Sequence, residues 1–69
     1  MLLLDGAKAG PNRVVVVGER GSIYITPDNG ETWNAVPSGT SKTLTGVAFS
    51  DDNHGWAVGH GGVVLATRD

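Results

Sequence analysis

The chain has 69 residues, contains no cysteine, and carries a formal net charge of −2 from five basic and seven acidic residues. So short a chain forms one domain at most and buries only about 60% of the surface that it exposes when unfolded. The lack of cysteine excludes disulfides and thiolate metal sites, so association with other copies is the device left for completing a small core. The weak negative charge, without a basic run, argues against a nucleic-acid groove and against binding to an anionic membrane surface.

The apolar runs are too short for a membrane span or an export signal. The longest, at 14–17 and 63–66, have four residues each, whereas a transmembrane helix needs about 20. Residues 1–4 are likewise shorter than the apolar core of a signal peptide. We therefore expect no membrane insertion, and the sequence leaves the compartment open.

Short apolar runs and eleven glycines, without a 3.6-residue periodicity, predict an all-β fold. Segments rich in β-branched and aromatic residues alternate with turns rich in glycine, proline, asparagine and aspartate. The expected strands are residues 2–8, 13–18, 22–27, 31–36, 43–49, 54–59 and 63–67. The four valines at 14–17 are uninterrupted where a half-exposed strand would alternate, so we expect this strand to be covered on both faces.

In one segment the residue types, their order and their spacing all favour the same local geometry. Between the strands at 22–27 and 31–36 the chain reads Thr26-Pro27-Asp28-Asn29-Gly30-Glu31-Thr32-Trp33. Proline presets φ for the second place of a tight turn, Asp28 can fold back onto backbone N–H groups, and Asn29-Gly30 supplies left-handed positions. These residues predict a hairpin turn.

The pattern Thr-x-Asp-x-Gly-x-Thr-Trp at 26–33 resembles the Asp-box, the BNR-type repeat of sialidases, sortilin-type receptors and photosystem II assembly factor-like propellers. Val-Gly-x-x-Gly-x-Ile before it and Gly-Trp-Ala-Val-Gly in the second half look most like the photosystem II assembly factor group. The resemblance implies four-stranded β-propeller blades, in which the box joins the third and fourth strands as a structural element. The residues to which it gives a structural role are Thr26, Asp28, Gly30, Thr32 and Trp33.

Within this turn we expect the Asp28 carboxylate to satisfy backbone N–H groups and the Trp33 indole to cover an apolar seam. Calcium binding is the alternative, because Asp28, Asn29 and Glu31 are rich in oxygen. The twelve-residue ligand spacing of an EF-hand is missing, however. We therefore predict no metal here.

The sequence repeats itself at a constant offset. Residues 14–28 align with 55–69, with identities at valine, glycine, threonine and aspartate positions. A β-rich repeat of about 40 residues is typical of propellers. We therefore predict a first blade at residues 1–40 and a second at 41–69 that lacks the counterpart of strand 31–36, about one and three-quarter blades in all.

Such an open set of blades would leave apolar faces in water. Burying one Val or Leu side chain contributes roughly 1.5–3 kcal/mol, so several left exposed would offset most of the net stability of a small domain. We expect the second blade of one copy to contact the first blade of the next, and this head-to-tail contact forms a ring if the rotation closes. Since propellers have about 4–8 blades, a homo-oligomer of three copies with six blades is the leading expectation, ahead of two or four copies. The alternative is that the chain is a fragment of a longer propeller.

The turns between second and third strands, at 18–21 and 59–62, keep their outer glycines while the residues between them differ. In propellers these turns and the connection to the next blade lie along the same rim of the central channel. The predicted rim residues are Glu19, Arg20, Ser38, Thr40, Lys42 and His60. Arg20 can pair with a carboxylate or stack on an aromatic ring, and it resembles the arginine often found at this turn in the family. The alternative is that these turns are merely solvated.

Neither histidine predicts a metal site within one chain. Copies of His60 around an axis would form a metal or anion site, but its companion in the chain, His54, stands at the opposite end of a strand. We expect His54 to be a satisfied turn histidine beside Asp52. Trp56, in the second strand of its blade, is expected to pack in the core or between blades.

These observations favour a non-enzymatic propeller that acts as a protein-interaction or assembly scaffold, without a cofactor, whose partners are copies of itself and another protein. One alternative is a carbohydrate-binding, lectin-like propeller that uses Trp56 or Tyr24 to stack on a glycan. The least favoured alternative is a fragment of a glycoside hydrolase. Asp51 and Asp52 are adjacent in a strand connection and should point apart, and the arginine, tyrosine and acidic pattern of sialidases is missing from the sequence.

Overall fold

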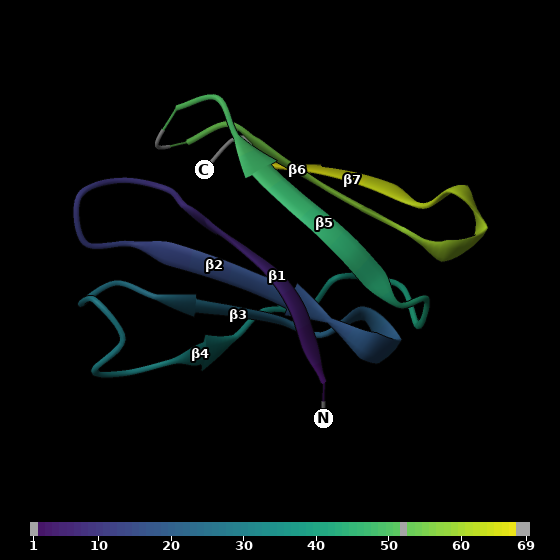
Figure 1. Ribbon diagram of the computed structural model, residues 1–69, viewed down its shortest axis with the longest axis horizontal. Coiled ribbons are helices and arrows are strands. Elements are labelled where there is room, and N and C mark those ends of the chain that lie inside the picture. Colours follow the sequence, from purple (N-terminus) through teal and green to yellow (C-terminus); the bar gives the residue numbers. More distant parts are fainter. Residues whose placement is uncertain (1, 52, 68–69) are drawn as a thin grey trace.

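The computed structural model describes residues 2–51 and 53–67, which form two antiparallel sheets (Figure 1). The first sheet has the strand order β1-β2-β3-β4, and the second has the order β5-β6-β7. The strands are β1 (Leu3–Lys8), β2 (Val14–Gly18), β3 (Ile23–Thr26), β4 (Asn34–Ala35), β5 (Leu44–Phe49), β6 (Gly55–Gly59) and β7 (Val64–Thr67). Single turns of 3₁₀ helix, η1 (Glu19–Gly21) and η2 (His60–Gly62), connect β2 to β3 and β6 to β7. The prediction of an all-β fold is confirmed.

The strand expected at 31–36 is reduced to β4, which pairs with β3. The Thr32 backbone N–H donates to the Asp28 carboxylate at 2.9 Å, so this residue belongs to the turn and not to the ladder. Beyond β4, the Val36 N–H donates to the Ile23 carbonyl at 2.9 Å. The turn therefore includes residues that strand propensity alone would assign to the sheet.

Side chains on β2 and β3 alternate between the two faces of the first sheet. The apolar side chains of these strands that face the second sheet are Val15, Val17, Ile23 and Ile25. On the opposite face, Val16 pairs with Tyr24. Val15 and Val17 are buried, whereas Val14 and Val16 are only half-buried. The four valines were expected to be covered on both faces of the sheet. Within residues 2–51 and 53–67, the second sheet covers one face, the face of Val15 and Val17.

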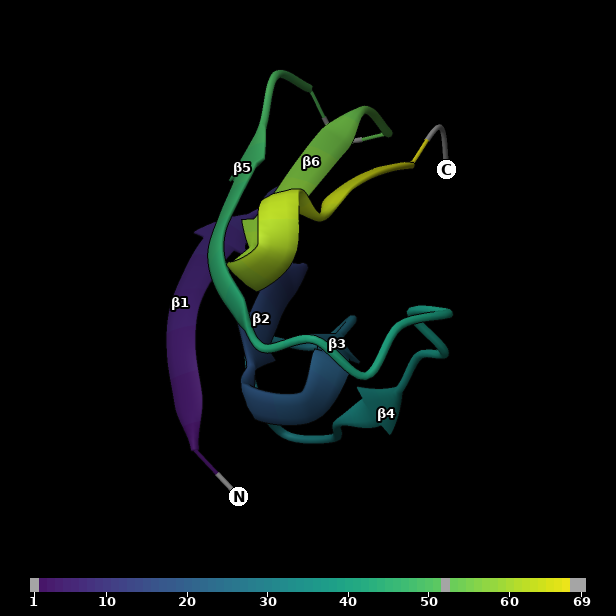
Figure 2. The ribbon, with the colours of Figure 1, turned by 90° about the vertical axis from the view of Figure 1, so that its right-hand side faces the viewer.

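The core lies between the two sheets. Its buried members are Val17, Leu44 and Ala57, and the residues packed against them are Ile23, Val47, Val63 and Leu65. The first strands of the two sheets, β1 and β5, are neighbours (Figure 2). The Asp5 carboxylate on β1 accepts a hydrogen bond from the Val47 backbone N–H on β5 at 3.0 Å. The sheets are thus joined by apolar contacts and by a polar link.

The second sheet repeats the first at the offset found in the sequence, which takes residue 14 to residue 55. Under this shift the bounds of β1, β2, η1 and β3 coincide with those of β5, β6, η2 and β7, respectively. Hydrogen bonds repeat as well: the Gly18 N–H donates to the Ser22 carbonyl and the Gly59 N–H to the Val63 carbonyl, both at 3.0 Å. The period read from the sequence is therefore also the period of the structure. The number of blades in a closed ring, its completion by copies of the chain, and the division between residues 40 and 41 stay predictions.

Predictions that involve Asp52 or Asp69 lie outside the described residues. They concern the neighbour of His54, the pair of adjacent carboxylates, and the last position of the sequence repeat. Within the described part of the chain, no helix has the length and apolar character needed to traverse a bilayer.

Candidate functional site

The turn at 26–33 is held together by the Asp28 side chain and two threonines. The Asp28 carboxylate accepts hydrogen bonds from the Thr26 hydroxyl at 2.8 Å, from the Thr32 hydroxyl at 2.7 Å and from the Thr32 backbone N–H at 2.9 Å. The hydroxyl oxygen of Thr26, a fully buried residue, accepts in turn from the Gly30 N–H at 2.7 Å. The Thr26 hydroxyl therefore connects the carboxylate to the backbone of the turn by hydrogen bonds.

These donors lower the pKa of Asp28. The largest effect comes from the Thr32 hydroxyl, followed by the Thr32 backbone N–H and the Thr26 hydroxyl. Each of them stabilises the charged carboxylate more than the neutral acid. The turn is thus built around an ionised aspartate.

The same turn is also tied to the turn between β1 and β2. The Asn29 N–H donates to the Asn12 carbonyl at 2.8 Å, and the two side-chain amides meet at 3.1 Å. Asn29 and Gly30 have positive φ values of 59° and 93°, the left-handed positions that the turn requires. These contacts hold one end of the first sheet.

The opposite end of both sheets carries η1 and η2, which lie on the same side of the molecule (Figure 2). At the start of η1, a Cβ on Gly18 would clash with the Leu2 carbonyl oxygen, although the φ of −166° is ordinary extended backbone. A Cβ on Gly59 would clash in the same way with the Thr43 carbonyl. The Glu19 N–H donates to the Leu2 carbonyl at 3.0 Å, and the first N–H of η2 donates to the Thr43 carbonyl at the same distance. Close backbone approach therefore fixes the position of both turns.

The connection between β4 and β5 runs past both turns. The Arg20 N–H of η1 donates to the Thr43 hydroxyl at 3.4 Å. Within the connection, the Ser38 hydroxyl donates to the Thr40 carbonyl at 3.1 Å and accepts from the Thr40 N–H at 3.3 Å. The Lys42 N–H donates to the Thr40 hydroxyl at 3.1 Å. Short hydrogen-bonded loops thus order this connection beside η1.

The structure places the six predicted rim residues at this one end, on η1, on η2 and on the connection between β4 and β5. Arg20, Lys42 and His60 are exposed. Glu19 is half-buried, and its carboxylate accepts a hydrogen bond from the Leu2 N–H at 3.0 Å. This end therefore exposes the cations of Arg20 and Lys42 and the His60 side chain to solvent. The neighbouring Glu19 carboxylate is hydrogen-bonded to the backbone of the same chain.

Arg20 has an unusual backbone conformation. Its φ and ψ are 58° and 28°, and Gly61, which takes the same place in η2, has 72° and 17°. A residue with a side chain pays about 1–2 kcal/mol for this left-handed conformation, whereas glycine does not. Backbone strain held in place by surrounding contacts is common at functional positions, so Arg20 stands out among the exposed rim residues.

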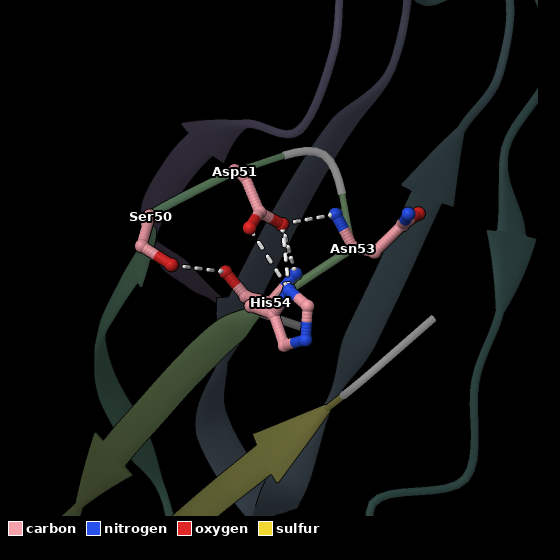
Figure 3. A network of polar contacts seen from close by, with 4 residues as sticks. All are labelled: Ser50, Asp51, Asn53 and His54. Carbon is pink, nitrogen blue, oxygen red and sulfur yellow. Dashed lines mark hydrogen bonds and ion pairs between the residues drawn. The ribbon is translucent and has the colours of Figure 1, made fainter.

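The histidines lie at opposite ends of β6, His60 at the rim and His54 at the far turn. The His54 Nδ1 atom lies 2.8 and 2.9 Å from the two carboxylate oxygens of Asp51, and its backbone N–H donates to the same carboxylate at 2.8 Å (Figure 3). The Asn53 N–H lowers the pKa of Asp51 most, and the His54 side chain lowers it further. His54 is thus a partnered turn residue. Among the described residues, no three histidine, aspartate or glutamate side chains gather as a metal-ligand set.

Both tryptophans are 46% exposed. One borders a shallow hollow of about 440 Å³ on the first sheet, whose lining residues are Leu3, Val16, Tyr24 and Trp33. The other, Trp56, pairs with Ala66 on the outer face of the second sheet. In the single chain each indole therefore keeps an open side. That Trp33 covers an apolar seam, and that Trp56 packs in the core or between blades, stay predictions.

The sequence did not predict the roles of two residues. Asp5 links the two sheets, and Thr43 links η1 to the connection between β4 and β5. Asp5 had a signal: it is a carboxylate directly after three leucines at 2–4. Such a group is tolerated beside a core when it finds a donor, and the donor is the Val47 N–H. Thr43 had no distinguishing signal, because its role depends on the approach of η1, which is distant in sequence.

Comparison with known proteins gives three results. The family model described as Photosynthesis system II assembly factor YCF48 matches residues 2–68. The chloroplastic photosystem II stability/assembly factor HCF136 of Cyanidioschyzon merolae (strain NIES-3377 / 10D) is 50% identical over 42 residues, which cover 58% of this chain and 10% of that protein. A solved structure, YCF48 bound to D1 peptide, matches with a TM-score of 0.83 and 28% identity over 97% of this chain and 23% of that chain.

The chain thus spans about a tenth of the curated relative and less than a quarter of the solved one. The family match nevertheless covers almost all of its own residues, and the two sheets resemble part of the solved propeller. This chain belongs to the Photosynthesis system II assembly factor YCF48 family.

Proposed function

We propose that the chain is a non-enzymatic β-propeller unit that serves as a protein-interaction or assembly scaffold. Its family consists of assembly factors by name, and the solved relative is bound to a D1 peptide. In this proposal residues 1–40 form one blade, residues 41–69 belong to a second, and further copies of the chain complete the ring. The turn at 26–33 acts in each copy as a structural clasp of the Asp-box type.

The observation that carries the proposal is the exposure of Arg20 and Lys42 on a rim whose backbone is tightly fixed. η1 is held by the hydrogen bonds from Glu19 and Arg20 to neighbouring segments, and the Lys42 N–H is bonded to the Thr40 hydroxyl in the connection between β4 and β5. Both cations therefore project from hydrogen-bonded backbone. A guanidinium recognises carboxylates with a planar fork of donors. The ligand that this end fits best is therefore a peptide that carries a terminal or side-chain carboxylate.

Repetition of the rim around an axis would strengthen such binding. Equal weak sites on one assembly gain through effective concentration when the partner reaches more than one of them. Several copies of Arg20 and Lys42 at one opening would also add their positive potentials. The scaffold would then act by display of identical sites, without chemistry of its own.

The test is a fluorescence anisotropy titration with a labelled D1 peptide. We expect saturable binding to the wild-type chain, and a loss of at least about tenfold in affinity for Arg20→Gln, which removes the charge and the fork of donors but keeps a polar side chain. Binding should weaken as salt rises, because exposed charges are screened. Lys8→Gln is the matched control: it removes a positive charge from the far end of β1, and affinity should stay the same.

Two results would contradict the proposal. One is the lack of saturable peptide binding by a folded wild-type chain. The other is equal affinity for the wild type, Arg20→Gln and Lys42→Gln, because the peptide would then bind away from the rim.

A further inference from the structure

One of the four asparagines of the chain is followed directly by glycine, at Asn29-Gly30 in the turn at 26–33. Asparagine is thermolabile, because its side chain loses ammonia when the backbone nitrogen of the next residue attacks the side-chain carbonyl carbon. Glycine has no Cβ to obstruct this approach. Both residues are exposed, so water reaches them. The pair therefore has the residue types and the exposure that deamidation needs.

The reaction requires water and no other reactant from outside the chain. The Gly30 nitrogen forms a bond to the Asn29 Cγ atom, and the bond from Cγ to Nδ2 breaks. The side-chain nitrogen leaves as ammonia with the proton of the Gly30 N–H, and a cyclic succinimide remains. Water then opens the ring at either carbonyl, which gives aspartate or isoaspartate at position 29.

In the folded turn the attacking nitrogen is held by another partner. The Gly30 N–H donates to the Thr26 hydroxyl oxygen at 2.7 Å, and Thr26 is fully buried. The Thr26 hydroxyl donates in turn to the Asp28 carboxylate at 2.8 Å, which fixes the acceptor in place. A nitrogen in this bond keeps its proton and its orientation, whereas the attack requires it to give up both. The closed turn therefore blocks the nucleophile.

The leaving group is held separately. The Asn29 side-chain amide donates to the Asn12 side-chain oxygen at 3.1 Å, and the Asn29 backbone N–H donates to the Asn12 carbonyl at 2.8 Å. Asn12 belongs to the turn between β1 and β2, so it binds the amide from a different segment than the one that holds Gly30. The two reacting groups of this neighbouring pair are thus bound to different partners.

We propose that Asn29 is a deamidation site that the closed turn at 26–33 protects and that opening of the turn exposes. Segments of a protein open locally without unfolding of the whole domain, and reactions of the open form follow its equilibrium population. The rate of modification then depends on how often the Gly30 N–H leaves Thr26. The hydrogen bonds involved lie in the first sheet at the end opposite the rim, so the proposal goes beyond the peptide function and is independent of it.

Modification would also weaken the turn that protects the site. A carboxylate at position 29 has no N–H to donate to Asn12, and it adds a negative charge between Asp28 and Glu31, where like charges disfavour one another. Isoaspartate lengthens the main chain by a methylene group and displaces the Gly30 N–H from its acceptor. Both products favour the open turn, and the ammonia is lost for good. A single opening event can therefore leave a permanent change.

The test follows deamidation at Asn29 by peptide mass spectrometry in the folded wild type and in the same chain unfolded in urea, at one mildly alkaline pH. Asn34, which precedes Ala35, is the internal reference. We expect Asn29 to deamidate at least about tenfold faster in urea than in the folded chain, and faster than Asn34 in urea. Equal rates at Asn29 in the folded and unfolded chain overturn the proposal. So does a rate at Asn29 in urea that is no higher than the rate at Asn34.

A matched pair of variants tests the turn itself. Thr26→Val removes the hydroxyl at similar size, whereas Thr26→Ser keeps it. We expect deamidation at least about tenfold faster for folded Thr26→Val than for the wild type, and a rate close to that of the wild type for Thr26→Ser. Hydrogen exchange of the Gly30 amide should rise by a similar factor, because the same N–H carries out the attack. An unchanged rate for folded Thr26→Val, or equal acceleration by both variants, overturns the proposal.

Folding of each variant is checked by far-UV circular dichroism. If Thr26→Val is unfolded, Asn12→Ala takes its place, because Asn12 is exposed and its side chain holds the leaving amide. We expect Asn29 to deamidate about fivefold faster in Asn12→Ala than in the wild type. Asn12→Asp keeps an acceptor oxygen and should stay close to the wild-type rate. Equal rates for Asn12→Ala and the wild type would then overturn the proposal.

Discussion

The carboxylate of Asp5 on β1 accepts a hydrogen bond from the Val47 N–H on β5, at 3.0 Å across the junction of the two sheets. Val47 packs against the core cluster, so its N–H lies where apolar contacts also hold the sheets together. Removal of the acceptor would leave this donor without its side-chain partner, which carries a free-energy cost. We expect Asp5→Ala to lower the melting temperature and to speed hydrogen exchange of the Val47 amide at least about tenfold.

The matched control for Asp5→Ala is Lys8→Ala, on the same strand. Lys8 is exposed, and its replacement should leave exchange at Val47 unchanged. Equal exchange at Val47 in the wild type and in Asp5→Ala would show that the carboxylate does not hold the junction.

Gly18 should tolerate substitution less well than Gly62. A Cβ on Gly18 would clash with the Leu2 carbonyl oxygen, whereas a Cβ on Gly62 meets nothing within 4 Å and is disfavoured only by its φ of +77°. We expect Gly62→Ala to cost about 1–2 kcal/mol of unfolding free energy and Gly18→Ala to cost more, because backbone must move in a packed junction. Urea denaturation measures both variants. Equal losses would mean that the rim backbone is free to shift.

The all-β class and the repeat period could be predicted from the sequence, because both depend on local residue types and on their recurrence. The shortening of the strand at 31–36 could not. Strand propensity favours extension there, but the Thr32 N–H is drawn into the turn by the Asp28 carboxylate. The sequence pattern also did not predict which individual residues are buried. Val16 and Val17 are adjacent valines, but of the two only Val17 packs against the second sheet.

The candidate site was partly predictable for the same reason. The glycines at 18–21 and 59–62 indicated two equivalent turns, and the fold brings both to one end. The left-handed backbone of Arg20 was not foreseeable, since arginine has no preference for this conformation. The link from Arg20 to the Thr43 hydroxyl joins residues far apart in the chain, and no local pattern encodes it.

The core should depend on Leu44 far more than on Leu4. Leu44 is completely buried between the sheets, whereas Leu4 is 44% exposed on the neighbouring first strand. Leu44→Ala deletes the same atoms as Leu4→Ala but leaves a cavity, so we expect it to cost about 2–5 kcal/mol of unfolding free energy. Leu4→Ala should cost less than half as much. Similar losses in urea denaturation would place the core elsewhere.

Replacement of Arg20 by glycine should separate stability from binding. Glycine adopts the left-handed conformation without strain, as Gly61 does in η2, but it also gains freedom in the unfolded chain. Because these effects oppose one another, we expect Arg20→Gly to change the unfolding free energy by less than about 1 kcal/mol, while affinity for the D1 peptide falls as it does for Arg20→Gln. A large loss of stability would assign Arg20 a role in holding η1 and would make the binding data uninformative for this variant.

Acid should destabilise the fold through the turn at 26–33 and through the Asp51 turn. The pKa values of Asp28 and Asp51 lie below the ordinary 3.8 in the folded chain, in the first case mainly because of the Thr32 hydroxyl and in the second mainly because of the Asn53 N–H. A carboxyl whose folded pKa is depressed contributes stability that is complete above its unfolded pKa and is lost as the pH falls through the folded value. We therefore expect the melting temperature to fall as the pH is lowered from about 5 to about 2.

Asp28→Asn tests how much of the acid destabilisation comes from the turn at 26–33. The amide keeps one acceptor oxygen but no charge, so the variant should melt below the wild type at neutral pH and show a shallower decline in acid. Glu31→Gln is the matched control, because it removes a negative charge from the same turn, at a residue whose backbone N–H alone contacts Asp28, at 3.4 Å. Its melting curve should follow the wild type in acid. Parallel curves for Asp28→Asn and the wild type would mean that the ionised carboxylate is not what holds the turn, and the acid loss would then belong to Asp51 and its partners.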